Sequence, residues 1–133
     1  RFFVAHEGMV EEITRMGVEP NRVVVSGIPV RPRFSESLDQ SSIKERLKLD
    51  PNLPIILLMS GGNAIGPLVE TLGALSRVKH PLQVVAIAGK NRQTFRELKR
   101  LMRAVKLEGR VLGFVENIHE WMVAADLLIS KAG

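Results

Sequence analysis

Continuous apolar runs alternate with segments of helical periodicity along most of the chain. The runs typical of strands are residues 54–59, 83–88, 111–115 and 126–130. Between them, residues 68–75 and 92–106 carry apolar side chains at helical spacing. Strands that alternate with helices predict a parallel sheet with right-handed crossovers. The expected fold class is therefore α/β, a Rossmann-like parallel sheet with flanking helices.

Shorter elements precede this region. Residues 2–5 and 22–26 predict two strands, with a helix over residues 7–16 between them. Residues 27–32 contain two prolines, which exclude a helix and favour an extended segment. This segment is the best linker candidate in the chain.

Two short helices complete the pattern. Ser41 or Ser42 can cap the first one, because a hydroxyl oxygen accepts a hydrogen bond from the first turn. The second helix covers residues 118–125, and its spacing favours a core position for Trp121 and Met122.

Composition and charge narrow the class of protein. The 133 residues include no cysteine, and 45% are hydrophobic, as in a soluble domain with its own core. We therefore expect a cytoplasmic protein. The net charge of +5 favours anionic partners. The basic helix at residues 92–106 is either a solvated outer face or a peripheral contact with an anionic membrane surface. No basic stripe with interleaved aromatic residues is present, so no nucleic-acid partner is expected.

Small or polar residues follow each strand of the main region. In parallel sheets, ligands bind at the carboxyl ends of the strands. Glycine lets a ligand approach the backbone, and a helix N-terminus beyond it suits a phosphate. Each glycine can also simply make a tight turn, but four such loops at one edge favour a phosphate-bearing ligand. The loops are residues 60–63, 89–91, 113–117 and 130–133.

Several other site chemistries are disfavoured. Residues 61–66 lack the glycine spacing of a dinucleotide fingerprint and the Gly-Lys-Ser/Thr ending of a P-loop. Neither a metal-ligand cluster nor an Asp-x-Asp pair occurs, so no metal site is expected. His6, His80 and His119 are poor candidates for a catalytic base, and His119 is expected on the solvent side of its helix.

An ordered set of motifs resembles glycosyltransferase family 28, and most closely its diacylglycerol glycosyltransferases and monogalactosyldiacylglycerol synthases. The first motif is Val-Ser-Gly-Ile-Pro-Val-Arg-Pro-Arg-Phe at residues 25–34. Further motifs follow at residues 59–62, 88–91, 113–122 and 125–133. Each motif alone is weak, but their order and spacing agree along nearly the whole chain.

The resemblance implies a GT-B architecture, in which two Rossmann-like domains face each other across a cleft. Residues 1–30 would be the end of the N-terminal acceptor domain with its linker, and residues 31–133 a truncated C-terminal UDP-sugar-binding domain. The implied enzyme is a hexosyltransferase that moves a sugar from a UDP-sugar to a membrane lipid acceptor such as diacylglycerol. It would need no cofactor besides this donor. The catalytic base would lie in the acceptor domain, so the catalytic residues stay unknown and this chain alone is expected to be inactive.

The resemblance also implies where the donor binds. The loop of Phe114 and Val115 would read the uracil through backbone groups, and the loop after residue 129 would lead into the diphosphate site. The family usually has Lys-Pro-Gly-Gly where this chain has Lys131-Ala132-Gly133. The residues expected to bind the nucleotide sugar are Gly61, Gly62, Asn63, Gly89, Asn91, Phe114, Val115, Ser130, Lys131 and Gly133.

Two alternatives remain open. The first is a UDP-sugar epimerase of the same architecture, which would use no lipid acceptor. The second, from another class, is a non-catalytic nucleotide-binding module. The partners expected for the leading hypothesis are a UDP-sugar, a lipid acceptor and an anionic membrane surface, together with self-association of the chain through exposed apolar surface.

Overall fold

The computed structural model describes residues 1–61 and 67–131. The chain forms two compact units, Arg1–Glu36 and Ser37–Gly133. The unit boundary follows Glu36, a few residues beyond the domain boundary expected near residue 30. The assignment of residues 1–30 to an acceptor domain stays a prediction.

The first unit is a small βαβ arrangement. Strand β1 (Phe2–Val4) pairs in parallel with β2 (Val23–Val25), and helix α1 (Gly8–Arg15) connects them. One single-turn 3₁₀ helix, Pro20–Arg22, lies between α1 and β2, and another, Pro32–Phe34, follows β2. Both begin with proline, whose fixed φ suits the first position of a helical turn.

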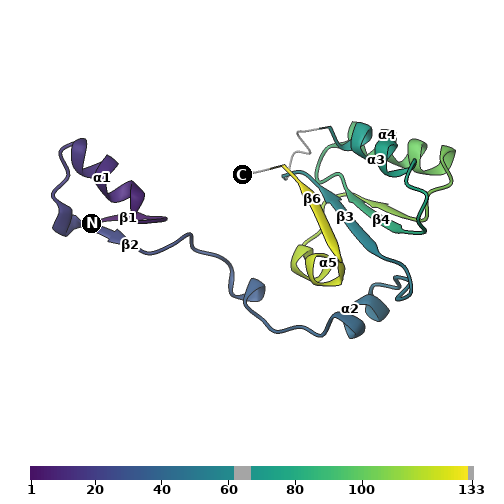
Figure 1. Cartoon of the computed structure of the whole chain (residues 1–133), viewed down its shortest axis with the longest axis horizontal. Coiled ribbons are helices and arrows are strands. Elements are labelled where there is room, and N and C mark those ends of the chain that lie inside the picture. Colours follow the sequence, from purple (N-terminus) through teal and green to yellow (C-terminus); the bar gives the residue numbers. More distant parts are fainter. Residues whose placement is uncertain (62–66, 132–133) are drawn as a thin grey trace. The chain divides into compact units, whose positions relative to one another are not determined.

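The second unit is built on a four-stranded sheet, in which every paired strand is parallel to its neighbour. The spatial order is β5-β4-β3-β6 (Figure 1). The predicted parallel sheet is therefore confirmed. The strands are β3 (Ile55–Met59), β4 (Gln83–Ile87), β5 (Gly109–Leu112) and β6 (Leu127–Ser130).

Helices cover both faces of this sheet (Figure 1). On one face, α3 (Leu68–Leu75) and α4 (Arg92–Ala104) pack their buried leucines against β3 and β4. On the other face, α2 (Gln40–Arg46) and α5 (Ile118–Ala124) pack against the alternate residues of the same strands. This two-sided burial explains why β3 and β4 are continuously apolar in sequence.

Two predicted element boundaries were wrong. Helix α2 is capped by Asp39, whose Oδ2 accepts a hydrogen bond from the Ser42 backbone N–H at 2.8 Å. A carboxylate three residues before that N–H satisfies it directly, so Ser41 and Ser42 fall inside the helix region. Strand β5 begins at Gly109 and ends at Leu112, earlier than expected. Phe114 and Val115 therefore lie in the loop beyond the strand.

The second short helix also departs from expectation in part. Trp121 is buried, as its spacing predicted, and its indole N–H donates to the Asn117 side-chain oxygen at 3.2 Å. Met122 is 40% exposed, so the core position predicted for it is wrong. His119 was expected on the solvent side, but its side chain is only 13% exposed and lies beside Glu120.

Within residues 1–61 and 67–131, no helix combines the length and the apolar character needed to cross a bilayer.

Candidate functional site

The reversal of strand order at β3 creates a topological switch point between β3 and β6. From β3 the chain moves outward to β4 and β5, and then returns to the other side of β3 as β6. The carboxyl ends of β3 and β6 lie side by side at this switch point. This is the place where open α/β sheets bind their ligands.

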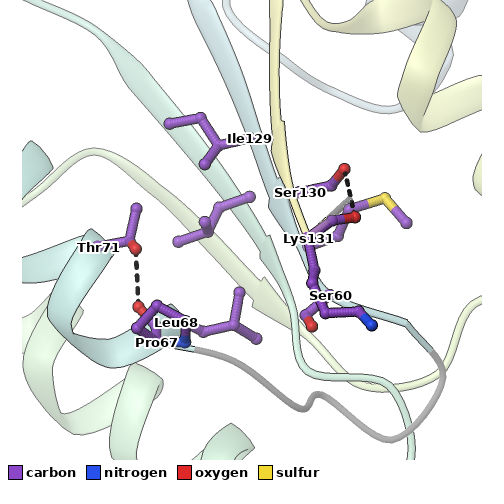
Figure 2. Close-up of a pocket in the computed structure, with 9 residues that line it drawn as sticks. Ser60, Pro67, Leu68, Thr71, Ile129, Ser130 and Lys131 are labelled. Carbon is purple, nitrogen blue, oxygen red and sulfur yellow. Dashed lines mark hydrogen bonds between the residues drawn. The ribbon is translucent and has the colours of Figure 1, made fainter. Parts of the chain in front are cut away.

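A pocket of about 260 Å³ lies at this switch point (Figure 2). The ends of β3 and β6 form one part of its wall, and the beginning of α3 forms another. Met59 and Ser130 are register partners, so the two strand ends lie side by side. The lining residues are Leu58, Met59, Ser60, Pro67, Leu68, Thr71, Ile129, Ser130 and Lys131.

The polar groups of this pocket suit an anion. Thr71 Oγ1 donates to the Pro67 carbonyl at 2.7 Å within the first turn of α3, and Ser130 Oγ donates to the Lys131 carbonyl at 3.4 Å (Figure 2). Among the described residues no side chain caps the N-terminus of α3, and the positive end of the helix dipole there suits an anion. Lys131 adds a full positive charge at the same place.

A second pocket of about 190 Å³ adjoins the first. Met59 and Ser60 line both pockets, so they meet at the end of β3. The second pocket is more apolar, and Phe114 in its wall is 59% exposed. An apolar pocket suits the base of a nucleotide, and the adjoining pocket that suits an anion would match its phosphates. The lining residues are Met59, Ser60, Gly61, Ile87, Gly89, Phe114, Val115 and Ile118.

Asn91 has a structural task at this edge. Its side-chain Oδ1 accepts hydrogen bonds from the backbone N–H groups of Gln93 and Thr94, each at 3.0 Å. Asn91 is thus the N-cap of α4. The cap engages the amide oxygen, which leaves the side-chain NH₂ as the group that Asn91 can offer to a ligand.

The structure brings most of the predicted donor-binding residues to these pockets. Ser130 and Lys131 line the pocket at the switch point. The second pocket contains Gly61, Gly89, Phe114 and Val115. Gly62, Asn63 and Gly133 lie outside the described residues, so their predicted roles stay predictions.

Sequence reasoning did not select several residues that line the site. Ser60 belongs to the predicted loop at residues 60–63 and Met59 to the motif at residues 59–62, but neither was among the residues expected to bind the donor. Thr71 and Ile129 come from a helix face and a strand face, where periodicity marks core positions rather than ligand contacts. Lys90 lies inside a predicted loop but lines neither of these pockets, and its ammonium nitrogen is 5.3 Å from the centroid of the Phe114 ring.

In the part of the chain that the structure describes, no three His, Asp or Glu side chains are grouped so that they could hold a metal ion. The expectation of a metal-free site stays a prediction.

Similarity to known proteins decides the family. Over 125 residues, the chain is 38% identical to a protein from Oryza sativa subsp. indica named probable monogalactosyldiacylglycerol synthase 2, chloroplastic, covering 88% of this chain and 26% of that protein. Over 137 residues, it is 32% identical to a processive diacylglycerol beta-glucosyltransferase from Bacillus subtilis (strain 168), covering 100% of this chain and 35% of that protein. The chain is homologous to part of the sequence of diacylglycerol glycosyltransferases. The family resemblance read from its motifs is confirmed.

This diacylglycerol glycosyltransferase homologue spans about a quarter to a third of the length of these relatives. No protein-family model matches it. Among solved structures, it resembles a glycosyltransferase from Rickettsia africae ESF-5, with a TM-score of 0.59 and 21% sequence identity. That match covers 96% of this chain and 37% of the Rickettsia chain. At this level of identity the likeness concerns the fold, and it agrees with the Rossmann-like α/β class.

Proposed function

We propose that the full protein is a hexosyltransferase that transfers a sugar from a UDP-sugar to diacylglycerol. The observation that carries this proposal is the pair of adjoining pockets at the switch point, in a chain whose relatives are named for diacylglycerol glycosylation. The second pocket would take the uracil beside Phe114 and Val115. The first would take the diphosphate beside Lys131.

The chemistry follows from these placements. The acceptor hydroxyl attacks the anomeric carbon of the sugar, the bond from that carbon to the diphosphate oxygen breaks, and UDP leaves. The N-terminus of α3 and the ammonium of Lys131 would stabilise the charge that develops on the leaving diphosphate. The proton of the hydroxyl would pass to a base that the family resemblance assigns to the acceptor domain.

The acceptor suggests that the protein works at a membrane surface, because diacylglycerol stays in the bilayer. Exposed cations on α4 offer one contact with anionic lipid, each contributing about 1 kcal/mol near such a surface. A peripheral position on a cytoplasmic membrane face is therefore part of the proposal. These cations are Arg96, Lys99, Arg100 and Arg103.

The test is an activity assay on the full natural protein. A panel of radiolabelled UDP-hexoses is incubated with vesicles that contain diacylglycerol, and the lipid fraction is analysed for glycolipid. We expect label in the lipid with at least one donor. Interconversion of UDP-sugars without lipid product would instead identify an epimerase, and nucleotide binding without turnover would identify a binding module.

A variant connects the assay to the pocket. Lys131→Met should weaken binding of the donor roughly 10- to 100-fold, because a charge-assisted hydrogen bond contributes about 1.5–3 kcal/mol. Lys79→Met is the matched control, since Lys79 is exposed and lines neither pocket. Equal donor affinity in wild type and Lys131→Met, measured by calorimetry, would remove the first pocket from the donor site.

A further inference from the structure

Lys90 and Phe114 lie on neighbouring loops at the carboxyl edge of the sheet. Lys90 comes three residues after the end of β4, and Phe114 two residues after the end of β5. The loops approach closely, since a Cβ on Gly113 would lie 3.6 Å from the Gly89 carbonyl oxygen. The ammonium of Lys90 is 5.3 Å from the centroid of the Phe114 ring, within range of a cation–π interaction.

The two side chains belong to different hollows. Phe114 lines the second pocket, which is the proposed uracil site, and Lys90 does not line it. Lys90 lines a separate hollow of about 230 Å³ beyond the same loops, together with Asn91 and Phe95. The ammonium therefore contacts the ring without itself forming part of the wall of the nucleotide pocket.

The surroundings favour this contact. Phe114 is 59% exposed, so packing alone leaves its ring free to adopt other rotamers. Across the described residues, no ion pair joins Lys90 to a carboxylate that would draw its ammonium away from the ring. The next residue, Asn91, is fixed as the N-cap of α4, which anchors the backbone that carries Lys90.

We propose that Lys90 is a positioning residue, which holds the ring of Phe114 in the wall of the nucleotide pocket and thereby sets the affinity for the uracil base. The inference rests on the proposed function, because it takes the second pocket as the base site. It assigns Lys90 no direct contact with phosphate. Its effect should be the same for any uridine nucleotide, whatever the number of phosphates.

The experiment uses the full natural protein and calorimetric titrations with UMP and UDP. Lys90→Met keeps most of the length of the side chain but removes its charge, and it should raise both dissociation constants by the same factor, about two- to five-fold. Lys90→Arg should restore the wild-type values, because a guanidinium also stacks on aromatic rings. In a Phe114→Leu background, Lys90→Met should have no further effect, since the ring through which it acts is gone.

Lys99→Met is the matched control. Lys99 makes a similar exposed contact with the Phe95 ring, at 5.6 Å, but lines neither nucleotide pocket. It should bind both nucleotides as the wild type does, and the melting temperatures of all variants should agree.

Three results would overturn the inference. They are a loss that is larger for UDP than for UMP, an undiminished loss in the Phe114→Leu background, and wild-type affinity in Lys90→Met when Phe114→Leu alone weakens binding. A wild-type protein that binds neither nucleotide would instead contradict the proposed function itself.

Discussion

The two sides of the main sheet are built in different ways. On the side of β4 and β5, every residue of β4 is buried between helices. On the other side, β6 leaves Leu127 and Leu128 exposed at 55% and 40%. Strand β4 is thus covered on both faces, whereas the outer strand β6 is partly open to solvent.

The two sides also differ in what holds their outer strands. At β5, Gly109 has a φ of +137° and its backbone lies so close to Val84 that a Cβ would collide with the Val84 carbonyl. At β6, the residue before the strand provides the link. Asp126 Oδ2 accepts from the Ile55 N–H at 2.8 Å, and Lys44 lies 3.3 Å away. Close backbone packing of Gly109 stabilises the position of β5, whereas the hydrogen bond and ion pair of Asp126 stabilise that of β6.

The largest effect is expected on the β5 side. Gly109→Ala would place a methyl group against the Val84 carbonyl, at a φ that L-residues rarely adopt. The strand must shift to relieve both, so we expect a loss of roughly 4 kcal/mol in the free energy of unfolding. Urea unfolding followed by circular dichroism would measure it. Wild-type stability would show that β5 does not need this close approach.

A second glycine provides the control for that substitution. Gly73 lies inside α3, and a Cβ there would meet only the Leu101 side chain, at 3.9 Å. Gly73→Ala should therefore stabilise the protein by about 0.5–1 kcal/mol, because alanine has the higher helix propensity. If both substitutions destabilise equally, the effect at Gly109 has no specific connection to β5.

The next largest loss is expected on the β6 side. Asp126→Ala removes the acceptor for the Ile55 N–H and the partner of Lys44, whose side chain is only 11% exposed. Leaving these donors unsatisfied should cost about 1–3 kcal/mol. Asp126→Asn keeps an oxygen acceptor and should cost less. Equal unfolding curves for wild type and Asp126→Ala would contradict the stabilising role of these contacts of Asp126.

The same carboxylate makes the β6 side sensitive to pH. The Ile55 N–H, and to a smaller extent Lys44, lower the pKa of Asp126 below its ordinary 3.8, although burial acts in the opposite sense. Because the pKa is lower in the folded state, this stabilisation is present above about pH 4 and is lost as the pH falls through the folded pKa.

The stability difference between wild type and Asp126→Asn should therefore shrink between pH 5 and pH 2.5 in urea titrations. Asp39, whose pKa the Ser42 N–H also lowers, titrates in both proteins and cancels. A constant difference over this range would contradict the assignment.

Sequence patterns predicted the parts of the fold that depend on local periodicity. Burial on both faces gives β3 and β4 continuous apolar runs in the sequence. Burial of one face gives α4 apolar residues at helical spacing, so all three elements were recognisable. The strand order β5-β4-β3-β6 leaves no such trace, since it is set by packing between distant segments. The early start of β5 was missed because Gly109 resembles a turn residue until its contact with Val84 is known.

The candidate site divides in the same way. Loops at strand ends could be predicted, and Gly89, Phe114 and Ser130 do line the pockets. Residues that reach the site from the face of an element, such as Thr71, could not, because their position depends on which strands become neighbours.

The smallest effect on stability, and a direct test of the open side, is expected at the exposed leucines of β6. Within the described residues β6 pairs only with β3. Its outer edge can therefore pair with another copy of the chain, and its exposed leucines can pack against that copy. We expect this chain to self-associate in a concentration-dependent way, as measured by multi-angle light scattering. Replacing Leu127 and Leu128 together by lysine should shift the chain towards monomer, because charges on an edge strand oppose edge-to-edge pairing. The free energy of unfolding should change by no more than about 0.5 kcal/mol for each substitution, as is usual for exposed positions.

Val78→Lys is the control, since Val78 is 46% exposed but lies in the loop after α3. A wild-type chain that stays monomeric at all concentrations, or a Val78→Lys variant that dissociates equally well, would show that the open side of the sheet is not the surface through which copies meet.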